Sequence, residues 1–130
     1  MIPYQEIIKQ LSERFGIRIA LVFGSLAKNQ ARPESDLDIA VAAPHPLSTN
    51  EKVEFIEALA EASGRPVDLI DLQVARGPIA AQALTTGKLI HCTDRTLYAE
   101  LILRMLCDQA DWAPYRERIL AERRKAWIGL

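Results

Sequence analysis

Two aspartates one residue apart, Asp36 and Asp38, begin an apolar stretch, and ten residues separate them from a Gly24–Ser25 pair that closes an earlier apolar stretch. Side chains alternate along a strand, so both carboxylates point to one side of it and Leu37 points to the other. Carboxylates this close repel and raise each other's pKa unless a positive charge lies between them. A divalent cation meets that need, because Mg²⁺ prefers oxygen ligands and is commonly held by carboxylates together with substrate phosphates.

The Gly24–Ser25 pair has the chemistry of a phosphate site. Glycine lacks a Cβ, so a phosphate can approach its backbone closely. Ser25 offers a hydroxyl and stands where a short helix over residues 26–30 could begin, with free backbone amides directed at an anion. A turn that folds the end of the first strand beside the start of the second brings this pair to the same pocket as Asp36 and Asp38. We therefore expect a phosphate cradle next to a metal site.

A third carboxylate is expected from the next apolar stretch, residues 66–72, because two metal ions about 3.5–4 Å apart need more than one pair of ligands. If this stretch runs parallel to the strand of Asp36 and Asp38, the starts of the two strands lie side by side. Asp68 stands near the start of the stretch. Asp71 lies about 10 Å further along and on the opposite face. We predict Asp68 as the third ligand, with Asp71 as the alternative.

The elements that must position these residues follow from apolar periodicity and from Gly and Pro punctuation. Strands are expected over residues 17–23, 36–43, 66–72 and 88–92, and helices over 3–15, 51–62, 75–86 and from 94 onward. This order predicts an α/β fold with a small mixed sheet flanked by helices, in which strands two and three pair in parallel through a right-handed crossover. We expect a domain over residues 1–92 and a long C-terminal helical segment over 93–130.

The bulk composition narrows the function classes. The 130 residues are 49% apolar and 25% charged with a net charge of −1, which suits one globular domain and argues against direct nucleic-acid binding. Cys92 and Cys107 form no metal-binding spacing and are expected to be reduced thiols in the core. The sequence shows no signal peptide and no apolar run of about 20 residues, so we expect a cytoplasmic protein without membrane contact.

The spacing Gly24-Ser25, ten residues, Asp36-Leu37-Asp38 resembles the GSX10DXD signature of DNA polymerase β-like nucleotidyltransferases. The chain more closely resembles the minimal nucleotidyltransferases (MNT), the antitoxins found beside HEPN-domain toxins. The resemblance covers roughly residues 1–92, including the segments VDLIDL and GKLIHCTD. Many relatives carry arginine at the place of Leu26 and glycine at the place of Asn29, so contact of Lys28 or Arg32 with phosphate stays open.

The resemblance implies an enzyme that transfers AMP from ATP to a hydroxyl group, expected to be a tyrosine, of a cognate HEPN ribonuclease toxin, and so neutralises the toxin in a hetero-oligomer. It implies that Asp36, Asp38 and Asp68 are catalytic and hold two Mg²⁺ ions. Gly24 and Ser25 are implied to bind the nucleotide. Two alternatives remain open: an antitoxin that inhibits by binding alone, and a nucleotidyltransferase that modifies a small-molecule alcohol such as an antibiotic.

The C-terminal segment gives a second, weaker indication of a partner. Residues 96–112 are apolar almost all round, which is typical of a helix buried on more than one side, against its own domain or against another chain. Pro114 is expected to interrupt this helix. Residues 114–130 carry five Lys or Arg against two Glu, a charge that suits either a solvated face or a docking surface.

Overall fold

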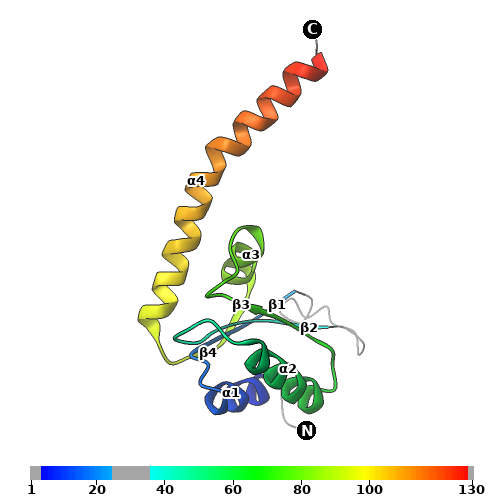
Figure 1. The fold of residues 1–130 in the computed structure, drawn as a ribbon, viewed down its shortest axis with the longest axis vertical. Coiled ribbons are helices and arrows are strands. Elements are labelled where there is room, and N and C mark those ends of the chain that lie inside the picture. The colour runs from blue at the N-terminus through cyan, green and yellow to red at the C-terminus, as the bar shows by residue number, and fades with distance from the viewer. Residues whose placement is uncertain (1–3, 25–35, 129–130) are drawn as a thin grey trace.

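The computed structural model describes residues 4–24 and 36–128, which form four helices and a four-stranded sheet (Figure 1). In chain order the elements are α1 (Tyr4–Arg14), β1 (Ile19–Phe23), β2 (Leu37–Ala42), α2 (Thr49–Ser63), β3 (Val67–Asp71), α3 (Pro78–Thr86), β4 (Lys88–Cys92) and α4 (Arg95–Ile128). All these elements were expected from the sequence, with ends that differ by a few residues. The short helix predicted over 26–30 lies outside the described residues.

The sheet is mixed, as predicted, with the strand order β3-β2-β1-β4. β1 pairs antiparallel with both β2 and β4, whereas β2 and β3 pair in parallel. α2 forms the crossover between the two parallel strands. The end of β1 and the starts of β2 and β3 therefore lie at the same edge of the sheet.

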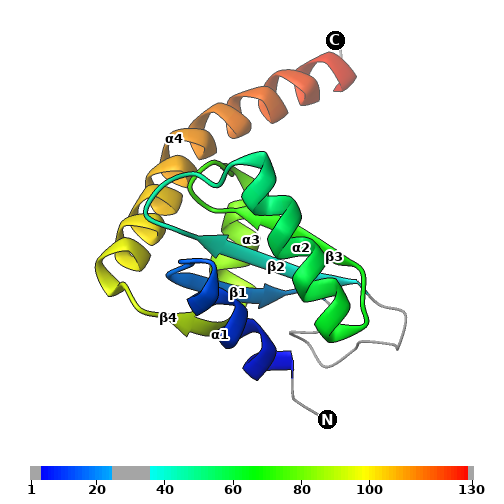
Figure 2. The same ribbon diagram turned by 60° about the horizontal axis from the view of Figure 1, so that its bottom comes forward.

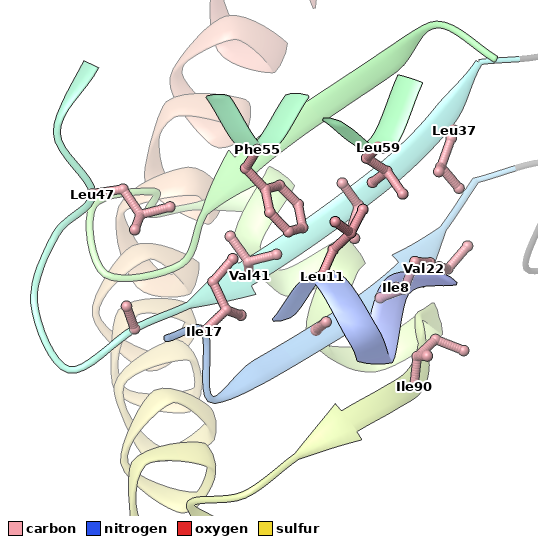
Figure 3. Close-up of a cluster of buried hydrophobic side chains, with 13 residues drawn as sticks. Ile8, Leu11, Ile17, Val22, Leu37, Val41, Leu47, Phe55, Leu59 and Ile90 are labelled. Carbon is pink, nitrogen blue, oxygen red and sulfur yellow. The ribbon is translucent and has the colours of Figure 1, made fainter. Parts of the chain in front are cut away.

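Both faces of the sheet are buried. Figure 2 shows α1 and α2 over one face and α3 behind the other. The first face packs apolar side chains from the strands, α1 and α2 into one core, seen in Figure 3, with members that include Ile8, Val22, Leu37, Phe55 and Leu59. The second core lies under α3 and the first turns of α4, with members that include Leu21, Phe23, Ala83, Leu101 and Met105. Leu37 and Phe23 thus belong to opposite faces.

Local chemistry explains where α2 begins and ends. Ser48 is the N-cap: its hydroxyl accepts from the Glu51 amide at 3.1 Å, and its own amide donates to Glu51 Oε1 at 3.0 Å. This reciprocal pair is a capping box. It starts the helix at Thr49, two residues before the predicted position. Gly64 ends the helix with a φ of 70° and donates its amide to Ala60 O.

The long helix α4 corrects two expectations and tests a third, burial on more than one side, against its own domain alone. It is continuous from Arg95 to Ile128, so Pro114 does not interrupt it; proline removes one helical hydrogen bond, but its fixed φ is that of a helix. Leu101 and Met105 are buried, but Leu103 is 61% exposed and Cys107 is also exposed. Within this chain, residues 95–110 of the helix therefore bury one side only, and Cys107 is not a core thiol.

α4 buries only one side because α3 already covers much of the sheet face that faces it. After its first turns α4 leaves the domain (Figure 1). Among the described residues, no helix has the length and apolarity that crossing a bilayer would require.

Candidate active site

The register of β2 and β3 brings two of the predicted carboxylates together. Asp38 is the direct parallel partner of Asp68. Leu37 and Ile39 belong to the core under α1 and α2, so the alternating side chain of Asp38 points to the opposite face, on the side of α3. Asp36 immediately precedes β2. Asp38 is half-buried, while Asp36 and Asp68 are exposed, so the group opens to solvent at the edge of the sheet.

Gly24 closes this group from the side of β1. Phe23 pairs with Asp38 across β1 and β2, and the chain then turns at Gly24 with a φ of +73°. A Cβ added at this position would lie 3.2 Å from Asp38 Cγ and would overlap Asp38 Oδ2. Glycine is therefore required here for two reasons, the left-handed backbone and the carboxylate that lies against it.

The negative charges of Asp36 and Asp68 both act on Asp38. The pKa of Asp38 is raised, chiefly because burial disfavours its charged form, and further because of the negative charges of Asp68 and then Asp36. Within residues 4–24 and 36–128, no cationic side chain is among the causes of this shift. Removal of such repulsion requires a proton or a cation.

Asp71, the alternative third ligand, lies elsewhere and has a structural task. Its buried carboxylate accepts from the Leu47 amide at 2.8 Å and from the Gln73 amide at 2.9 Å. Asp71 pairs with Val41 at the far end of the strands from Asp38. It therefore joins the loop after β2 to the turn after β3, and its hydrogen bonds leave it no part in the carboxylate group.

The three carboxylates are the kind of ligand that a divalent cation prefers. Asp36, Asp38 and Asp68 supply only carboxylate oxygens, at an open edge and with mutual repulsion that a cation would offset. Over residues 4–24 and 36–128, no three His, Cys, Asp or Glu side chains already stand at metal-binding distances from one another. The strands therefore place the carboxylates at the same end of the sheet, but their oxygens do not already surround a metal position.

Other candidate groups are accounted for. Ser25, Lys28 and Arg32 lie outside the described residues, so the predicted phosphate contacts of that loop remain predictions. His91 is buried with Nε2 3.1 Å from Ile17 O, and His45 Nε2 lies 3.6 Å from Glu51 Oε2 at the surface.

Sequence reasoning missed one contact at the site. It assigned Gly24 to phosphate approach, whereas the structure also uses it to make room for Asp38. The only sequence signal for this contact would have been the register between the two strands, which local patterns do not specify.

The family model for "Polymerase beta, Nucleotidyltransferase" matches residues 5–96. A protein adenylyltransferase, MntA of Shewanella oneidensis, is 33% identical over 103 residues, which cover 77% of this chain and 74% of that protein.

Two solved structures are similar along most of the chain. One is a toxin–antitoxin crystal structure with AMP-PNP, with a TM-score of 0.73 and 26% identity over 89% of this chain and 98% of that one. The other is a tri-AMPylated Shewanella oneidensis HEPN toxin in complex with an MNT antitoxin. Its matching chain has a TM-score of 0.68 and 25% identity, over 90% of this chain and 96% of that one.

Proposed function

The chain belongs to the polymerase β nucleotidyltransferase family, and on that premise we propose that it transfers AMP from ATP to a hydroxyl group of a cognate HEPN toxin and thereby neutralises the toxin. The observation that carries the proposal is the alignment of Asp36, Asp38 and Asp68 at one edge of the sheet, against Gly24. The AMP-PNP and the AMPylated toxin in the similar complexes support ATP as donor and a protein as acceptor.

In this proposal the chain's own residues position and polarise the reactants. Asp36, Asp38 and Asp68 would hold two Mg²⁺ ions, and Gly24 with Ser25 would place the β- and γ-phosphates. When bound, Mg²⁺ neutralises charge on the triphosphate and lowers the pKa of the acceptor hydroxyl. The acceptor oxygen bonds to the α-phosphorus as the bond to pyrophosphate breaks, and Asp68 accepts the hydroxyl proton. The rest of the rate enhancement comes from alignment of the reacting atoms.

A protein acceptor suits the size of the site better than a small molecule does. The carboxylates lie at an exposed edge of the sheet, and the described part of the chain adds no second domain over that edge. An enzyme that modifies a small alcohol needs a concave pocket that buries most of its substrate. A protein acceptor brings its own surface, so an open edge is sufficient. We therefore place the acceptor hydroxyl, expected to be a tyrosine, on the toxin.

Intact-mass spectrometry of the cognate HEPN toxin tests the proposal. The toxin is incubated with this protein, Mg²⁺ and each nucleoside triphosphate in turn. We expect the toxin to gain whole AMP units with ATP, and to gain none when the enzyme carries Asp36→Asn and Asp38→Asn. A matched variant, Glu54→Gln with Glu57→Gln on the exposed side of α2, removes the same charge and should remain active. Continued AMP transfer by the aspartate variant would overturn the assigned roles.

Toxin activity separates the proposal from inhibition by binding alone. If the Asp36→Asn, Asp38→Asn variant still silences the toxin's ribonuclease activity at equal concentration, neutralisation does not depend on transfer. We expect instead that this variant leaves the ribonuclease active, while the wild-type protein with ATP suppresses it lastingly after the two proteins are separated.

A further inference from the structure

A groove of about 860 Å³ lies between α3 and α4, and the proposed chemistry does not use it. α3 buries Ala80, Ala83 and Leu84 against the sheet, while its other side lines the groove with Gln82, Thr85 and Thr86. Met105 lines the other wall. Figure 1 shows α4 rising beside α3 as it leaves the domain.

Four of the polar side chains that line the groove, those of Arg76, Thr85, Thr86 and Asp108, have hydrogen-bond partners within the chain. Arg76 donates from Nε and Nη2 to the two carboxylate oxygens of Asp108, at 2.7 and 2.5 Å. The Thr85 and Thr86 hydroxyls each donate at 2.6 Å to a carbonyl of their own helix, four residues earlier. Gln82 and Gln109 are the other polar side chains of the lining, and both are uncharged. Because Arg76 and Asp108 neutralise each other, the groove complements an uncharged surface rather than a charged one.

The groove is preformed because α4 is fastened to the turn after β3. Arg104 donates to Leu72 O, and at 3.4 Å to Gln73 O. One helical turn further, Asp108 holds Arg76 of the same turn. These contacts fix the angle between α3 and α4, so an occupant would not have to organise the walls on binding, which favours affinity.

The C-terminal end of α3, where Thr85 and Thr86 line the groove, leads toward the catalytic edge. α3 ends at Thr86, and two residues later Lys88 pairs with Val22 near the end of β1. A Cβ added at Gly87 would lie 3.4 Å from Val22 O. Gly24, two residues after Val22, lies against Asp38. A chain segment that follows α3 toward its C-terminal end therefore emerges beside the carboxylate group.

We infer that the groove between α3 and α4 is the docking site for an apolar helix of the acceptor protein, which it orients so that the acceptor hydroxyl reaches Asp36, Asp38 and Asp68. The inference rests on the proposed function, since it assigns a binding surface to that acceptor. Because the C-terminal end of α3 leads toward the catalytic edge, the occupant we select is the acceptor, the partner whose hydroxyl must reach the carboxylates.

The test blocks the groove without touching the catalytic residues. Thr85→Arg with Gln109→Arg places two long cations at exposed positions of its walls. The control, Gln10→Arg with Thr96→Arg, makes the same substitutions at exposed positions of α1 and α4 outside the groove. Calorimetric titration with the cognate HEPN toxin, without ATP, measures docking separately from transfer. AMP-PNP binding with Mg²⁺ reports whether each variant keeps its nucleotide site.

We expect the groove variant to bind the toxin at least about tenfold more weakly than the control, with AMP-PNP affinity unchanged in both. Equal toxin affinity of the two variants would overturn the inference. It would also be overturned if sedimentation showed a wild-type dimer that only the groove variant dissociates. If wild-type protein binds the toxin but transfers no AMP, the proposed function fails, and the toxin affinities alone decide the docking site.

If the groove variant does not fold, photocrosslinking from a single groove position tests the docking site instead. Benzoylphenylalanine in place of Gln109 should crosslink to the toxin in the mixed complex. Crosslinks confined to a second copy of this chain would contradict the inference.

Discussion

Substitution of Gly24 by alanine separates backbone strain from displacement of a catalytic group. Gly24 has a φ of +73°, and a Cβ there meets the Asp38 carboxylate. Gly64 offers a matched control, because its φ is +70° and a Cβ there meets nothing within 4 Å. An L-residue in the left-handed region costs about 1–2 kcal/mol, so both alanine variants should lose roughly that much free energy of unfolding.

Only Gly24→Ala should also move Asp38. The overlap demands a shift on the order of 1 Å in the carboxylate, and misplacement of that size typically costs about 100-fold in rate, or about 2.7 kcal/mol of transition-state stabilisation. The assay is kcat/KM for AMP transfer to the toxin, measured well below the melting temperature of both variants. We expect Gly64→Ala to keep wild-type activity and Gly24→Ala to lose about two orders of magnitude. Equal activity of the two variants would refute the reasoning.

Three further predictions concern the side chains of Asp38, Asp71 and Ser48. Asp38→Asn should raise the free energy of unfolding at pH 7 in EDTA, because the wild-type protein loses stability as the pH rises through the raised pKa of Asp38. This stability difference between variant and wild type should vanish near pH 3.8. If the two proteins are equally stable at pH 7, the result counts against the shared carboxylate site. Asp71→Asn should cost about 1–3 kcal/mol in urea unfolding, since an amide nitrogen then faces a backbone donor, while AMP-PNP binding persists; lost nucleotide binding would return Asp71 to the site. Ser48→Ala should cost about 1 kcal/mol by removal of the capping box, and an unchanged urea midpoint would contradict that role.

Much of the fold follows from local patterns in the sequence. The strands are apolar and rich in β-branched residues between Gly, Pro and polar turns, so their existence and approximate ends could be predicted, and β4 lies over the predicted residues 88–92. Parallel pairing of β2 with β3 follows from the connecting helix. Because that pairing aligns the starts of the two strands, the neighbourhood of Asp38 and Asp68 could be derived before any coordinates.

Other features depend on tertiary competition that no local pattern encodes. The apolar surface of α4 predicts burial on more than one side, but α3 already occupies the sheet face, so Leu103 and Leu106 stay exposed in this chain. Before β4 is added, β1 and β3 are the two outer strands of the sheet, and local patterns do not decide which of them β4 joins. The contact of Gly24 with Asp38 depends on a register that only the folded sheet sets.

The most direct measurement of the central claim is an anomalous scattering map from crystals of this protein grown with AMP-PNP and Mn²⁺, an ion that substitutes for Mg²⁺ at carboxylate sites. Manganese peaks between Asp36, Asp38 and Asp68, at the phosphate end of the nucleotide, are the predicted result. A bound nucleotide with no manganese at these carboxylates, or with manganese held by other residues, would contradict it.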